Sequence, residues 1–87
     1  HQKGDAALAA RAVEATHAYF REWSRTSPGQ RIELVVKAAD LIRRRKSEFN
    51  AWLILEAGKN WPEAEADTAE AIDFCEYYAR LMAKCAR

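Results

Sequence analysis

Three carboxylates at helical spacing are the residues of this 87-residue chain whose pattern most suggests chemistry. Glu63, Asp67 and Glu70 occur in the run "PEAEADTAEAIDFCEYYAR", and on a helix they share one face. The same face continues into the apolar residues Phe74, Tyr77 and Leu81. Helix acids are most often a solvated surface near the N-terminus. A carboxylate that heads an aromatic face is costly to desolvate alone, so this pattern favours a position where a cationic or hydrogen-bonding partner arrives.

The same segment carries a second apolar face. Its members also step by three and four: Ala64, Ala71, Cys75, Tyr78 and Met82. One helix in so short a chain has little reason to bury two faces against its own neighbours. The pattern therefore predicts a partner surface that these residues do not contain.

The two cysteines do not form a catalytic pattern. Cys75 has no base and orienting group suggested beside it, as a nucleophile requires, and we interpret both Cys75 and Cys85 as packed thiols. They lie ten residues apart on one predicted helix, roughly 15 Å, which is too far for a disulfide. Reduced thiols are typical of a cytosolic protein.

Other chemical motifs are weak. "EAGK" at 56–59 lacks the glycines and the Ser or Thr of a phosphate loop, and Gly58 is better explained as a helix stop. "RRRK" at 43–46 suits a solvated helix end better than a nucleic-acid surface. His17 has no partner at metal spacing. We predict no catalytic, cofactor-binding or metal-binding residue in this chain.

The elements that position these residues are helices. Ala, Leu, Glu, Lys and Arg dominate, with three Gly and two Pro, and no alternating strand pattern occurs. We predict an all-α fold of three to four amphipathic helices, at about 5–23, 28–45, 48–57 and 61–86. The start signals are Ser27 with Gln30 and Asn60 with Glu63. A break is expected near 43–50, where Ser47 is a candidate cap. The second helix should bury Ile32, Val35, Ala39 and Ile42.

Charge and hydropathy indicate a soluble, unexported protein of one helical unit. No apolar run reaches the roughly 18 residues of a membrane span, and residues 1–20 lack a signal-peptide centre. Residues 1–46 hold ten Lys and Arg against five Asp and Glu, a balance of +5, whereas residues 47–87 hold four against eight, a balance of −4. The halves should attract each other, which favours internal packing over a nucleic-acid surface.

The order of motifs resembles the N-terminal helical region of the aldehyde dehydrogenase superfamily. The general pattern comprises Trp23, Arg31, the stretch 56–59 and the stretch 77–79. "EAGKNWPEA" and "DTAEAIDFCEYYAR" are most similar to the L-glutamate γ-semialdehyde (1-pyrroline-5-carboxylate) dehydrogenases of proline breakdown. The resemblance covers the chain from about Asp5 to its end. It implies that residues 1–87 are one helical segment, part of the nucleotide-binding domain of a larger α/β enzyme.

The resemblance carries over one site residue and makes its neighbour on the same face a second candidate. By its place in "AEAIDF", Glu70 matches a glutamate that lines the aldehyde pocket, and Phe74 lies one turn further on the same face. The family's nucleophilic Cys, general-base Glu, oxyanion Asn and nucleotide-binding motif have no match in this sequence. NAD is therefore implied only for a complete enzyme, in the cytoplasm. We expect the chain to be a truncated or fragmentary piece, and to be inactive alone.

Two other functions compete with this interpretation. An independent helical oligomerisation or interaction module would use the surplus apolar faces to join a second copy. A small nucleic-acid binder using 43–46 is the third. Since residues 49–55 and the Phe74 face cannot both be covered by so few helices, we predict self-association with exchange of helices, or association with the rest of an enzyme, and no membrane partner. A compact monomer that buries both Trp52 and Phe74 would contradict this.

Overall fold

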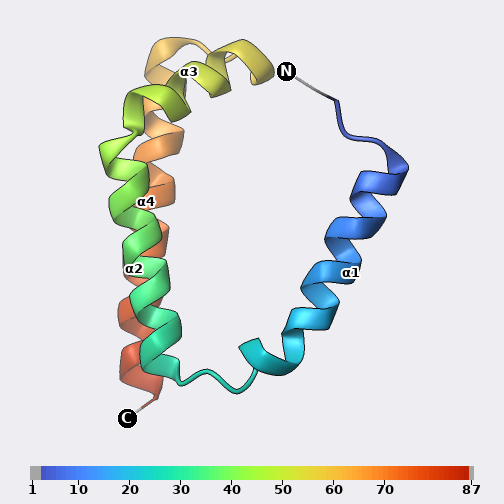
Figure 1. Ribbon diagram of the computed structural model, residues 1–87. Coiled ribbons are helices and arrows are strands. Elements are labelled where there is room, and N and C mark those ends of the chain that lie inside the picture. The colour runs from blue at the N-terminus through green and yellow to red at the C-terminus, as the bar shows by residue number, and fades with distance from the viewer. Residues whose placement is uncertain (1–2, 87) are drawn as a thin grey trace.

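The computed structural model describes residues 3–86 and is helical in the predicted order (Figure 1). Helix α1 spans Ala6–Trp23, α2 Pro28–Arg44, α3 Lys46–Ala57 and α4 Trp61–Cys85. The all-α prediction is confirmed, and each bound lies within two residues of its predicted place. Among the residues described, no helix is both long and apolar enough to cross a membrane.

The predicted start and stop signals explain these bounds. The Ser27 hydroxyl accepts a hydrogen bond from the backbone N–H of Gln30 at 3.1 Å. The side-chain Oε1 of Gln30 accepts one from the backbone N–H of Ser27, also at 3.1 Å. Asn60 and Glu63 form the same reciprocal box at the start of α4. Gly58 ends α3 with φ of 66°, a conformation that costs glycine little. Local side-chain chemistry therefore sets where three of the helices begin or end.

The junction between α2 and α3 differs from the prediction in its cap. The expected break is there, but it is confined to Arg45, whose φ is −106° and ψ is 24°. Ser47 does not cap α3, because the helix already begins at Lys46 and no side-chain cap forms. Instead, the Arg45 guanidinium donates to both carboxylate oxygens of Glu48 at 2.8 and 2.7 Å. An ion pair across the junction thus replaces the expected cap.

Helices α2 and α4 form an antiparallel hairpin, and α3 crosses one end of it (Figure 1). The fully or nearly fully buried apolar residues are mostly small: Ala39, Ala64, Ile72 and Ala79. Small side chains let two helix backbones approach closely. Of the residues expected to be buried on α2, only Ala39 is fully buried, whereas Val35 remains exposed.

The buried stripe of α4 follows a different row from the one predicted. It runs through Ala64, Thr68, Ile72 and Ala79, four or seven residues apart, as in packing along i±4 ridges. Ala71, which we assigned to this face, is exposed. From Ala71 onward the predicted row lies one residue before the buried one, since Ala71 precedes Ile72 and Tyr78 precedes Ala79.

Helix α1 stands apart from the other three (Figure 1). None of its residues is buried, although its apolar stripe includes Val13 and Phe20. Asp5 caps it by accepting the Leu8 amide at 2.7 Å. Its one described side-chain contact with the hairpin places the Arg31 guanidinium 6.0 Å from the ring centroid of Trp23.

The molecule is therefore larger than its length requires. Its radius of gyration is 16.0 Å, whereas a compact domain of this length has about 12 Å. Its accessible surface is 7255 Å², against about 5,200 Å² for a compact monomer of this mass. The excess of about 2,000 Å² is comparable to what a specific protein interface buries.

Candidate functional site

The three stacked carboxylates of α4 have three different surroundings. Glu63 belongs to the capping box at the helix start. Asp67 forms an ion pair with Lys59, with 3.0 Å between Oδ2 and Nζ. The hydrogen bond in this pair raises the pKa of Lys59 above its ordinary value. Glu70 is exposed, and within residues 3–86 it has no hydrogen bond or ion pair. Of the three acids, Glu70 is therefore the one available to a ligand.

Phe74 lies one turn beyond Glu70 and begins an exposed aromatic cluster. Its side chain is 51% exposed, and its ring stacks on Tyr78 with centroids 6.0 Å apart. Tyr77 meets Tyr78 edge to face at 5.1 Å. Tyr78, which we assigned to the packing face, thus joins the aromatic residues of the other face. The aromatic face of α4 that follows Glu70 therefore comprises Phe74, Tyr77 and Tyr78.

A buried polar contact fixes α3 on α4, and the sequence analysis missed it. Asn50 is 1% exposed, accepts the Thr68 hydroxyl at 2.5 Å and donates to Glu65 at 2.7 Å. Lys46 also pairs with Glu65. Hydrogen bonds from Lys46 and then from Asn50 lower the pKa of Glu65 below its ordinary value. The available signal was a single amide inside the apolar run 49–55.

Each cation of the stretch 43–46 forms an ion pair with a carboxylate of this chain. Arg43 pairs with Asp40 and, across the hairpin, with Glu76. Arg44 also pairs with Asp40 at 3.2 Å, and the two remaining cations have the partners described above. The attraction between the basic and acidic halves is thus realised at the α2–α4 and α3–α4 contacts. These pairings argue against a phosphate-binding patch.

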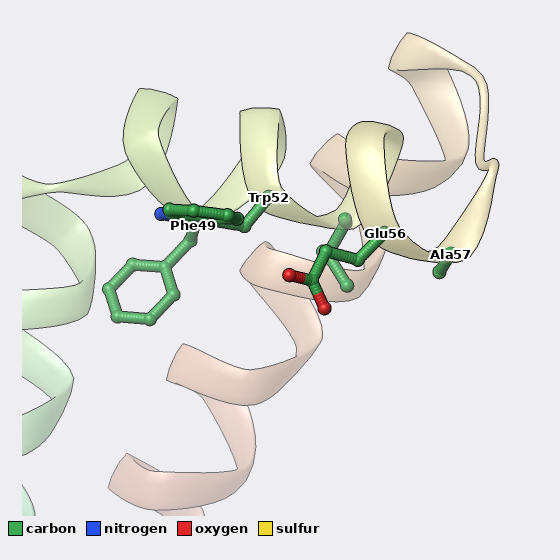
Figure 2. Close-up of a pocket in the computed structure, with 5 residues that line it drawn as sticks. Phe49, Trp52, Glu56 and Ala57 are labelled. Carbon is green, nitrogen blue, oxygen red and sulfur yellow. The ribbon is translucent and has the colours of Figure 1, made fainter. Parts of the chain in front are cut away.

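An apolar hollow of about 470 Å³ lies on α3 (Figure 2). Phe49, Trp52 and Glu56 project from the same side of the helix, and Leu53 and Ala57 complete the lining. Trp52 is 46% exposed. Both Trp52 and Phe74 therefore retain substantial exposed surface, and the partner that would cover them stays a prediction.

The thiols and possible metal ligands form no reactive centre in the part of the chain that is described. Cys75 is only half-buried on α4 and lies outside its buried stripe. Cys85 is exposed in the last turn, so its assignment as a packed thiol was wrong: the buried stripe ends at Ala79. Residues 3–86 contain no group of three metal-ligating side chains.

Comparison with known proteins agrees with the motif order. The sequence model of the aldehyde dehydrogenase family matches residues 1–87. A 1-pyrroline-5-carboxylate dehydrogenase of Geobacillus kaustophilus is 57% identical over 82 residues, which are 94% of this chain and 16% of that protein. The enzyme named 1-pyrroline-5-carboxylate dehydrogenase 2 of Bacillus subtilis is 54% identical over 79 residues, 91% of this chain and 15% of its own length.

No solved structure matches this chain. The chain spans about one sixth of the length of these curated relatives, 16% in the Geobacillus protein. The family match extends over every helix described above and includes the stretch with Glu70 and Phe74. This chain belongs to the aldehyde dehydrogenase family.

Proposed function

We propose that the chain is a helical segment of the nucleotide-binding domain of a 1-pyrroline-5-carboxylate dehydrogenase. Such an enzyme would oxidise L-glutamate γ-semialdehyde to glutamate with NAD in proline breakdown. The observation that carries the proposal is the 57% identity over 82 residues to a relative of that name. Two free thiols support a reducing, cytoplasmic compartment.

The exposed face of α4 would border the aldehyde substrate. Glu70 is accessible and unpaired within the described residues, so it can accept hydrogen bonds from the substrate ammonium group. Phe74 would form apolar wall beside it and exclude water from that contact. The ion pair of Asp67 with Lys59 holds the preceding turn in place. This segment would position the substrate and take no part in bond making.

NAD would accept the hydride, but residues 3–86 do not form a site for the phosphates of NAD. Gly58 ends a helix, and Lys59 is engaged with Asp67, so "EAGK" does not provide a loop of free amides ahead of a helix. Nucleotide and nucleophile would belong to other parts of the enzyme. The isolated chain should therefore oxidise no aldehyde. Turnover that disappears in Cys75→Ala would contradict this.

A chimera tests the proposal. In the Geobacillus kaustophilus enzyme, the matching 82 residues are replaced by those of this chain. The chimera should oxidise L-glutamate γ-semialdehyde. Glu70→Gln should lower kcat/KM for this substrate more than for an aliphatic aldehyde of similar length, because only the former carries an ammonium group.

The matched control is Glu33→Gln, which removes the same charge from an exposed position of α2. It should leave the ratio of the two kcat/KM values unchanged. An inactive but folded chimera would refute the proposed enzyme. An unchanged ratio in Glu70→Gln would remove Glu70 from the substrate site and leave the enzyme assignment standing.

A second candidate function is an oligomerisation module, favoured by the surplus surface of about 2,000 Å² and by the unpacked α1. Two copies would exchange α1 and cover the apolar stripe that contains Val13 and Phe20. Sedimentation of the 87-residue chain distinguishes the two. A discrete dimer favours the module, whereas heterogeneous association favours a segment separated from its enzyme.

A further inference from the structure

A second hollow, of about 170 Å³, lies between α2 and α4 at the end of the hairpin remote from α3. In Figure 1 this is the end where α1 joins α2 and where α4 ends. One cation, Arg31, lies in an otherwise largely apolar lining completed by Ile32, Val35, Tyr78, Ala79 and Met82. The hollow is therefore a small apolar recess with a positive charge at its wall.

The Arg31 side chain is incompletely satisfied. Its Nε–H is shielded from solvent and has no acceptor within residues 3–86. The ring of Trp23, 6.0 Å from the guanidinium carbon, provides a cation–π contact and no hydrogen-bond acceptor for that group. Buried donors without acceptors are rare in native proteins, and each calls for a physical explanation.

The cations at the α3 end of the hairpin provide a contrast. Every cation of the stretch 43–46, and Lys59 after it, has a carboxylate from this chain. Arg31 lies in the first turns of α2, where the positions three and four residues away are Ser27, Pro28, Leu34 and Val35. None of these four residues has a carboxylate side chain. The chain thus provides partners for its cations at one end of the hairpin and none for Arg31 at the other.

We propose that this recess receives an aspartate or glutamate side chain from the body of the enzyme, flanked by apolar residues. The inference rests on the proposed function, because it requires an enzyme body. A carboxylate can accept two parallel hydrogen bonds from a guanidinium, here from the Nη–H groups and, after a rotation of the Arg31 side chain, from the shielded Nε–H. The apolar lining excludes water and strengthens that contact. The excess surface of this segment, about 2,000 Å², is sufficient for docking on such a scale.

The same Geobacillus chimera tests the inference through its thermal unfolding midpoint. Arg31→Met keeps an unbranched stem but removes every donor, so it should leave the incoming acid buried and unpaired. We expect its midpoint to fall by roughly 5 °C. Arg31→Lys keeps the charge but loses the two parallel N–H donors of the guanidinium, so its midpoint should fall by an intermediate amount. Arg44→Met is the control, since its side chain is 74% exposed and pairs only with Asp40.

The isolated 87-residue chain provides the comparison that a local structural role would fail. There, Arg31→Met removes an unsatisfied donor, and the helical circular dichroism signal should not decrease. A loss of helical signal in the isolated chain, together with a lower unfolding midpoint in the chimera, would show that Arg31 acts only within its own segment, through Trp23. That result would overturn the proposal. The proposal would also be overturned if the Arg31→Met chimera had the same unfolding midpoint as the Arg44→Met chimera.

Two further outcomes are informative. A chimera that cannot assemble with Arg31 in place would contradict the proposal, because the enzyme body would then offer nothing that fits this recess. A chimera that folds but oxidises no semialdehyde would refute the proposed function, while its unfolding midpoints would still decide the role of Arg31.

Discussion

Helix α1 and the α2–α4 hairpin start from the same kind of sequence and reach different states. Both are amphipathic, and both begin with a capping side chain, Asp5 in one and Ser27 in the other. The hairpin buries a stripe of small residues, while α1 buries none. Caps and periodicity therefore suffice to make a helix, but burial requires a complementary surface, and α1 has none within this segment.

The largest expected difference between the two regions comes from adding volume. Ala39 on α2 is fully buried, so Ala39→Leu should force α2 and α4 apart and cost about 1 to 3 kcal/mol. Ala9→Leu on α1 adds the same atoms to an exposed position and should change stability by less than about 0.5 kcal/mol. Urea unfolding followed by circular dichroism measures both. Equal effects would show that α1 packs in solution.

Removing a buried polar contact should have the next largest effect. Asn50→Ala leaves the Thr68 hydroxyl without its acceptor and should lower the free energy of unfolding by about 1 to 3 kcal/mol. Thr16→Ala on α1 removes a hydroxyl that bonds only to carbonyls of its own helix and should be nearly neutral. If the Asn50 variant is as stable as the unsubstituted chain, the polar contact does not fix α3.

Cap deletions test whether the two regions unfold together. Asn60→Ala removes the acceptor of the Glu63 amide and should cost about 1 kcal/mol. Asp5→Ala removes the corresponding bond to Leu8, but it should only fray α1 and leave the cooperative transition in place. Amide hydrogen exchange separates these outcomes. A shift of the main transition by Asp5→Ala would show that α1 unfolds with the hairpin.

The smallest expected effect depends on pH. The folded pKa of Glu65 is below its ordinary value of 4.5, so its stabilising contribution is complete above that value and is lost as the pH falls through the lower folded pKa. Glu65→Gln should weaken the acid-induced loss of stability. Because the side chain is 41% exposed, salt should reduce the effect. Glu14→Gln on the unpacked α1 is the control.

Much of the fold follows from local chemistry and could be predicted. Capping boxes and the left-handed Gly58 act over a few residues, so the sequence shows them directly. Contacts between helices could not be found in this way. Which of Ala71 and Ile72 is buried depends on the ridge that meets α2, and the pairing of Asp67 with Lys59 depends on the path of the α3–α4 loop.

The candidate site shows the same limit. Spacing alone placed Glu63, Asp67 and Glu70 on one face, but only the surrounding contacts distinguish a cap, an ion pair and an accessible acid. The assignments of Glu70 and Phe74 to a substrate pocket came from family resemblance and stay predictions. The unsatisfied Arg31 donor could not be inferred from the sequence, because it depends on which neighbouring groups are within reach.

The separation of α1 has a consequence for the order of folding. Apart from the contact of Trp23 with Arg31, the packed helices all lie within residues 28–85. Because α2 packs chiefly on α4, as in the contact of Arg43 with Glu76, 33 residues further along the chain, α2, α3 and α4 can assemble only once α4 has left the ribosome. Helix α1 is synthesised before them, and within residues 3–86 the packed helices offer it no docking surface. Val13 and Phe20 are the most exposed large apolar side chains of α1, so within this helix they are the ones most open to aggregation until α1 is covered.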